Sequence, residues 1–280
     1  MSSSSTVLVT GATGQQGGAL AQLLLAKGRQ VRALTRKADS PAANELRSRG
    51  AELAVGDFED RASLERAMRG VDAVYLMATP FGGGTEAEVR QGTTAADVAR
   101  DAGVRHLVYS SVSDADRQTG IPHFDSKFEI EQHVRGLGIP YTLIAPAYFM
   151  ENLDLQVVRE GRLALPLPST RKLQQTALAD IAGFAALVLE RGESFLGKRI
   201  NIASDELSGR EMATLLSDVV GRSVEYVKVP LDRVMAQSED LGLMFEWFDR
   251  VGYSADIATL RREYPEVGWH TFEAWARTHA

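Results

Sequence analysis

The feature that most constrains the fold is a glycine-rich segment near the start of the chain, residues 6–18 (TVLVTGATGQQGG). The apolar run Val7, Leu8 and Val9 before the glycines predicts a buried strand, and residues 19–28 after them predict a helix that ends at a glycine. A strand, a glycine turn and a helix in this order are the first half of a βαβ unit.

The spacing of the three glycines indicates what the turn could hold. Gly11 permits a tight turn out of the strand, Gly14 lets the backbone approach a pyrophosphate, and Gly17 lets the helix pack closely on the strand. An anion bound there would meet the N–H groups and the positive dipole end of the helix. We therefore expect a dinucleotide across this turn. The alternative is a tight strand-to-helix turn that binds nothing.

Two basic residues follow the second predicted strand and bear on the choice of dinucleotide. An NAD-preferring protein usually carries Asp or Glu about twenty residues beyond the last glycine, where it binds the ribose 2′-hydroxyl. Here that place is taken by Arg36 and Lys37, whose positive charge suits a 2′-phosphate. We therefore expect NADP(H). The alternative is two solvated basic residues, with Asp39 as a weak candidate for the ribose.

Strand and helix patterns alternate through the first half of the chain. Apolar, β-branched segments predict further strands, with helical patterns between them, at 30–36, 51–55, 71–78, 106–110 and 141–146. Because crossover connections between parallel strands are right-handed, this alternation predicts an α/β protein with a Rossmann-type, doubly wound parallel sheet.

The regular alternation of strands and helices ends near residue 153, after which the predicted elements become shorter. We expect residues 1–153 to form the NADP(H)-binding Rossmann domain and residues 154–280 a smaller α/β lobe for substrate or partner, packed on the first and partly interleaved with it. The apolar cluster at 244–248 is interpreted as core of that lobe rather than as a ligand site.

Composition excludes several classes of function. The 280-residue chain has no cysteine, so disulfides and thiol nucleophiles are excluded, and its five histidines include no pair at metal-ligand spacing, so no metal is expected. A net charge of −6 argues against direct binding of nucleic acid. No apolar run is long enough to span a bilayer, and the start lacks the pattern of a signal peptide. We expect a cytoplasmic monomer or homodimer with no membrane contact.

Polar residues follow other predicted strands at the same edge of the sheet. Asp57 and Phe58 could hold an adenine by hydrogen bond and stacking, although Asp57 or Asp60 could instead cap the next helix. A glycine-rich turn at 79–84 follows the fourth strand and could act as a mobile lid or switch. The segment 146–153 leaves the sixth strand over the expected position of a nicotinamide.

With these motifs in place, the sequence resembles the NmrA-like proteins, atypical members of the short-chain dehydrogenase/reductase superfamily. The resemblance covers nearly the whole chain, and its motifs are GATGQQG at 11–17, TRK at 35–37, GDF at 56–58, HFDSK at 123–127 and PAYFMEN at 146–152.

The resemblance implies an NADP(H) site with the glycine loop on the pyrophosphate, basic residues on the 2′-phosphate, the aspartate turn near adenine, and the lysine and aromatic segment near the ribose and nicotinamide. The implied cofactor-binding residues are Gly11, Thr13, Gly14, Gln15, Gln16, Gly17, Arg36, Lys37, Asp57, Phe58, Ala78, Thr79, Pro80, Ser110, Lys127, Ala147, Tyr148, Phe149 and Asn152.

The chain departs from the superfamily at its usual acid. Ordinary members carry Tyr-x-x-x-Lys, in which the tyrosine donates a proton to a carbonyl, whereas this chain has His123 in that place and keeps the lysine as Lys127. His123 could still donate a proton, because histidine exchanges protons near neutral pH; otherwise it only lines the pocket. Tyr148 could donate a proton or cover the nicotinamide, and Ser110 or Ser111 matches the superfamily serine. Lys127, His123 and Tyr148 are the catalytic candidates.

Two functions are compatible with the sequence. The first is an NADPH-dependent oxidoreductase that transfers hydride to a small conjugated or aromatic, quinone-like acceptor, for which a missing tyrosine matters less than for a carbonyl. The alternative is a non-catalytic, NADP(H)-sensing regulatory protein that acts through protein partners. A pocket closed over the nicotinamide by the C-terminal lobe would favour the enzyme, and a shallow, open face the sensor.

Overall fold

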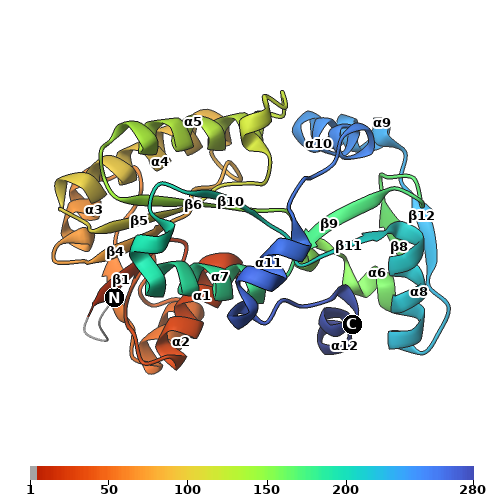
Figure 1. The fold of residues 1–280 in the computed structure, drawn as a ribbon, viewed down its shortest axis with the longest axis horizontal. Coiled ribbons are helices and arrows are strands. Elements are labelled where there is room, and N and C mark those ends of the chain that lie inside the picture. Colours follow the sequence, from red (N-terminus) through yellow and green to blue (C-terminus); the bar gives the residue numbers. More distant parts are fainter. Residues whose placement is uncertain (1–4) are drawn as a thin grey trace.

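The core of the molecule is a seven-stranded parallel sheet (Figure 1). The computed structural model describes residues 5–280. Every neighbouring pair of strands in this sheet is parallel, as the sequence predicted. The strands lie in the order β10 (Arg199–Ile202), β6 (Tyr141–Pro146), β5 (His106–Ser110), β4 (Ala73–Leu76), β1 (Thr6–Val9), β2 (Gln30–Thr35) and β3 (Glu52–Val55).

The chain changes direction across the sheet between β1 and β4. From β1 it first builds outward through β2 and β3, and then returns to lay β4, β5 and β6 on the other side of β1. The loops that leave β1 and β4 therefore diverge, and they open a crevice at the carboxyl ends of the strands, where ligands of such sheets bind.

Helices cover both faces of the sheet (Figure 1). One face is packed with apolar side chains of α1 (Gln15–Ala26) and α7 (Leu178–Arg191), which also contact each other. The other face carries α3 (Arg61–Met68), α4 (Gly84–Asp101) and α5 (Pro122–Gly136). The helix α2 (Pro41–Ser48) lies beside β2 and β3.

Two helix starts differ from the sequence expectation. α1 begins at Gln15 rather than at residue 19, because the residues after Gly14 already take helical geometry and place two glutamines in the first turn. β4 ends at Leu76 and α4 begins at Gly84, so Gly84 belongs to the helix rather than to the glycine-rich turn expected at 79–84.

The C-terminal half of the chain supplies both the sheet and a second group of elements. β10 pairs with β6, and α7 packs on α1, although both follow residue 153 in sequence. The remaining elements form the lobe, with β7 (Tyr148–Phe149), β9 (Lys172–Thr176) and β11 (Asp205–Ser208) in one small sheet and β8 (Arg162–Leu165) paired with β12 (Glu225–Lys228). Its helices are α6 (Leu155–Arg159), α8 (Gly209–Val220), α9 (Leu231–Gln237), α10 (Glu239–Arg250), α11 (Ile257–Glu263) and α12 (Phe272–His279).

An aromatic cluster holds α10 against the start of α5. Phe124 of α5 packs edge-on against Trp247 of α10, and Phe248 contacts Tyr253, with ring centroids 6.0 and 4.8 Å apart. Met244, Phe245, Trp247 and Phe248 belong to a buried apolar cluster, as interpreted from the sequence, but Met244 and Phe245 also line the cavity described below. The cluster therefore fixes α10 beside the carboxyl ends of β5 and β6 (Figure 1). Within residues 5–280, no helix combines the length and apolar character needed to cross a membrane.

A buried carboxylate ties the loop after β5 to the segment after α10. Asp114 accepts hydrogen bonds from the Ser254 N–H at 2.8 Å and the Ser254 hydroxyl at 2.5 Å, and from the Asn201 amide at 3.3 Å. Its backbone is left-handed, with φ of 60°, which aspartate tolerates better than alanine. This contact positions Tyr253, the neighbour of Ser254.

We expect Asp114→Ala to lower the free energy of unfolding by about 2–3 kcal/mol, because it leaves buried donors unpaired and places alanine in a left-handed conformation. Asp116→Ala is the control, because Asp116 is exposed and its partner Arg199, 3.4 Å away, keeps the buried Glu131 as a second partner; its cost should stay below about 1 kcal/mol. Denaturant unfolding measures both values, and equal costs would contradict the role given to Asp114.

Candidate functional site

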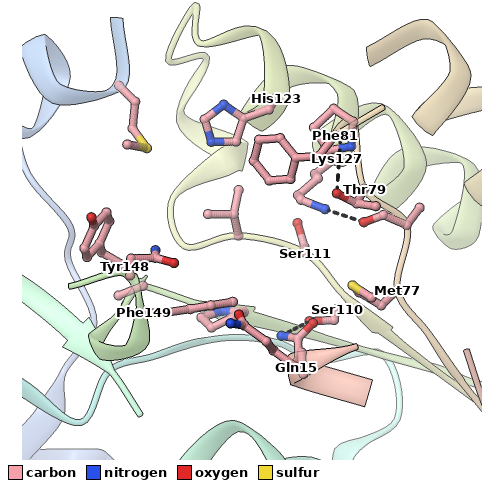
Figure 2. Close-up of a pocket in the computed structure, with 18 of the residues that line it drawn as sticks. Gln15, Met77, Thr79, Phe81, Ser110, Ser111, His123, Lys127, Tyr148 and Phe149 are labelled. Atoms are coloured by element: carbon pink, nitrogen blue, oxygen red, sulfur yellow. Dashed lines mark hydrogen bonds between the residues drawn. The ribbon is translucent and has the colours of Figure 1, made fainter. Parts of the chain in front are cut away.

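A cavity of about 520 Å³ lies at the carboxyl ends of β4, β5 and β6. Its walls come from the start of α1, the loops after these strands, the first turns of α5, and α10 with Tyr253 from the lobe (Figure 2). Twelve of the residues expected at the site line it: Gln15, Gln16, Ala78, Thr79, Pro80, Ser110, His123, Lys127, Ala147, Tyr148, Phe149 and Asn152.

The glycine loop forms one end of the site. Gly11 has φ of +61°, and a Cβ on Gly17 would lie 2.5 Å from the carbonyl oxygens of both Thr10 and Gly11. Since no side chain fits at that distance, α1 can approach the strand only through a glycine. The helix begins after Gly14 without a side-chain cap. Its first N–H groups are therefore available to an anion, as the spacing predicted.

The remaining expected cofactor residues lie outside the cavity but at the same edge of the sheet. Gly11, Thr13 and Gly14 belong to the loop after β1, and Gly17 lies in the first turn of α1. Arg36 and Lys37 follow β2 and are exposed, and Asp57 and Phe58 follow β3 and are partly buried.

Asp60, not Asp57, caps α3, with its carboxylate accepting from the Ser63 N–H at 3.2 Å. Asp57 accepts from the Glu59 N–H at 3.0 Å, within its own turn. The helix cap is therefore Asp60, and Asp57 stays a candidate for the contact with adenine.

Lys127 is held by a buried acid. Its ammonium group donates to Glu88 Oε1 at 2.7 Å and to the carbonyl of Ala78 at 3.0 Å. Glu88 is fully buried and also accepts from the Ser126 hydroxyl at 2.6 Å. An ammonium group has three N–H donors, so one remains for a molecule in the cavity.

The two serines at the end of β5 differ in their partners. Ser110 accepts a hydrogen bond from Gln16 at 3.0 Å, which joins β5 to the first turn of α1. The hydroxyl of Ser111 is buried and has no hydrogen-bond partner among residues 5–280, yet the residue lines the cavity. Because an unpaired buried hydroxyl is unfavourable, Ser111 fits a site that a polar ligand completes. The residues present fit a dinucleotide, since the glycine cradle suits its pyrophosphate and the unpaired Ser111 hydroxyl can bond a polar group in the cavity.

His123 lies on the opposite wall, in the first turn of α5 (Figure 2). Its ring Nδ1 is 2.5 Å from Asp240 Oδ1 on α10, so the histidine and its carboxylate come from elements 117 residues apart. The ring is mostly buried, with 11 % of the side chain exposed.

Tyr148 is packed among aromatic rings. It lies 6.0 Å from Phe245 and 6.2 Å from Phe248 between ring centroids. Burial raises the pKa of Tyr148 to about 12, so its phenol holds its proton tightly. This environment favours packing over proton donation.

Sequence reasoning missed most of the apolar wall. Leu241, Met244 and Phe245 are spaced as one face of a helix, which indicates burial but not what the face covers. The structure places that face over the carboxyl ends of β4, β5 and β6, which lie far earlier in the sequence. The further lining residues not singled out as site residues are Met77, Phe81, Val112, Pro146 and Tyr253.

Comparison with known proteins identifies the family. A sequence model of the NmrA-like family matches residues 3–276. The NAD(P)H azoreductase of Xenophilus azovorans is 30 % identical over 240 residues, covering 85 % of this chain and 82 % of the relative. A (4-alkanoyl-5-oxo-2,5-dihydrofuran-3-yl)methyl phosphate reductase of Streptomyces griseus is 31 % identical over 288 residues, covering 98 % of each.

A solved structure shares the fold. The crystal structure of NmrA, a negative transcriptional regulator, in complex with NADP superposes with a TM-score of 0.82 at 22 % identity, covering 99 % of this chain and 96 % of that one. Since the family match spans almost the whole chain and a relative covered over 98 % of its length is 31 % identical, the chain belongs to the NmrA-like family.

Proposed function

We propose that this chain is an NADPH-dependent oxidoreductase that reduces a small conjugated or aromatic, quinone-like acceptor by hydride transfer. The observation that carries the proposal is the junction of the glycine loop with a largely apolar cavity at one edge of the sheet. The first feature suits a dinucleotide, and the second suits a flat acceptor beside it.

The chain's own residues divide the cofactor site into three parts. The glycine loop and the start of α1 receive the pyrophosphate, Arg36 and Lys37 the 2′-phosphate, and Asp57 with Phe58 the adenine. The names of the azoreductase relative and of the NADP complex of NmrA support this cofactor.

At the other end, the lining residues orient the nicotinamide and its ribose. When bound, NADPH supplies the hydride. Lys127 keeps one N–H for a ribose hydroxyl, because Glu88 and the Ala78 carbonyl hold the other two. Ser111 offers its unpaired hydroxyl, and Tyr148 and Phe149 supply aromatic surface over the sheet.

The walls indicate the class of acceptor. Met77, Val112, Met244 and Phe245 present apolar surface. Phe81 stands at the cavity with 75 % of its surface exposed, so it can pack on a bound aromatic molecule. A planar conjugated acceptor would bury this surface, and it can accept hydride without the tyrosine of ordinary family dehydrogenases. The cover that α10 gives the cavity supports an enzyme over a protein that only senses the nucleotide.

The direct test is loss of NADPH absorbance with purified protein against a panel of quinones, enones and aldehydes, after NADPH binding has been confirmed by titration. We expect turnover with conjugated acceptors and little with simple aldehydes. Tight binding without turnover across the panel would contradict the enzyme and favour the sensing alternative.

Arg36→Glu should weaken NADPH far more than NADH, because only NADPH carries the 2′-phosphate. Loss of charge-assisted hydrogen bonds worth about 1.5–3 kcal/mol corresponds to roughly a ten- to hundredfold loss of NADPH affinity. Arg49→Glu, a charge reversal at a surface pair with Glu45, is the matched control and should leave both affinities unchanged. Equal weakening of NADPH and NADH by Arg36→Glu would refute the assignment.

Gly17→Ala should disturb both folding and NADPH binding. Its Cβ would stand 2.5 Å from two backbone carbonyl oxygens, so the loop must move, at about 1–3 kcal/mol of stability. Gly136→Ala is the control, because a Cβ there meets nothing within 4 Å near the end of α5. Unfolding curves and NADPH titrations measure the two effects. Unchanged NADPH affinity in Gly17→Ala would contradict the cradle.

A further inference from the structure

The pair of His123 and Asp240 joins the two parts of the molecule that enclose the cavity. One carboxylate oxygen of Asp240 lies 2.5 Å from the ring Nδ1 of His123 and 3.4 Å from its backbone nitrogen. His123 belongs to α5 beside the sheet, whereas Asp240 belongs to α10 of the lobe. Two contacts to one oxygen fix both the position and the rotation of the ring.

This geometry determines which ring nitrogen is available. A carboxylate only accepts hydrogen bonds, so Nδ1 carries the proton that faces Asp240. Nε2 is then the nitrogen left to meet a molecule in the cavity that His123 lines. The buried Glu88 is paired with the nearby Lys127. The carboxylate in contact with the His123 ring is that of Asp240.

We propose that Asp240 is a positioning residue that makes His123 the proton donor for a bound acceptor. The inference rests on the proposed function and deepens it, because it assigns the acid that replaces the superfamily tyrosine. Asp240 holds the ring with Nε2 toward the acceptor and balances the positive charge of the imidazolium. Asp240 belongs to α10, and the same helix supplies Leu241 and Met244 to the cavity wall. The pair of His123 and Asp240 is therefore assembled only where α10 covers the acceptor.

The step balances as follows for an azo compound. Hydride from NADPH forms one N–H bond, the N=N π bond breaks, and its electron pair on the second nitrogen takes the Nε2 proton of His123. NADPH is oxidised to NADP⁺, the azo group is reduced to a hydrazine, and the neutral imidazole regains a proton from water. A triarylmethyl cation differs, because hydride on its central carbon gives a neutral product and no proton is required.

A purely structural role for Asp240 has to be separated from this one. The residue before α5, Ile121, gives the helix no side-chain cap, and a carboxylate near the first turn favours a helix. Loss of Asp240 could therefore lower stability and slow every reaction alike. The two classes of acceptor separate the roles, because only the azo compound needs the proton.

The test compares rates at saturating NADPH and saturating acceptor for an azo dye and for a cationic triarylmethyl dye. We expect Asp240→Asn and His123→Gln each to slow the azo dye by roughly ten- to a hundredfold or more and to leave the cationic dye within about twofold of wild type. Glu239→Gln, which removes the exposed carboxylate beside Asp240 on the same turn, is the control and should change neither rate.

The double variant shows whether Asp240 acts through His123. If it does, the double variant His123→Gln with Asp240→Asn reduces the azo dye no more slowly than His123→Gln alone. This comparison can be made even if the wild-type protein reduces only the azo dye. Equal slowing of both dyes, additive losses in the double variant, or no loss on the azo dye would overturn the proposal. Absence of turnover by wild type with every conjugated acceptor, the two dyes and the quinones included, would contradict the proposed function itself, and this inference with it.

Discussion

The close approach of α1 to the end of β1 is the contact on which the site depends. A Cβ at Gly17 would come within 2.5 Å of two carbonyl oxygens, so only glycine allows the helix to start there. That start lies where the strand order changes direction, between β1 and β4, and it points uncapped N–H groups toward the crevice. The same edge of the sheet carries Arg36 and Lys37 after β2, the aspartate turn after β3, and the cavity at the ends of β4, β5 and β6.

The cavity itself depends on contacts that cross the molecule. The buried pair of Glu88 and Lys127 joins α4 to α5, and the pair of His123 and Asp240 joins α5 to α10. The aromatic cluster around Phe248 and the buried Asp114 hold the lobe where it covers the strand ends. One wall is thus polar and carries His123, which we propose as the proton donor, and the other wall is apolar.

Local patterns predicted the parallel sheet and the glycine loop, because short-range chemistry specifies both of them. They could not place β10 beside β6 or Leu241 over the cavity, since those positions result from packing between distant segments. Asp240 gave no signal, because its partner His123 is 117 residues away. The assignments of individual cofactor residues, and the division at residue 153, stay predictions.

The most direct measurement is the fate of the hydrogen that is transferred. NADPH labelled with deuterium at the reactive carbon of the nicotinamide is incubated with the protein and a triarylmethyl cation, and the product is analysed by mass spectrometry and NMR. Hydride transfer in the cavity predicts one deuterium on the central carbon of the product. A product whose new hydrogen comes from water, or no product from any conjugated acceptor despite bound NADPH, would contradict the account.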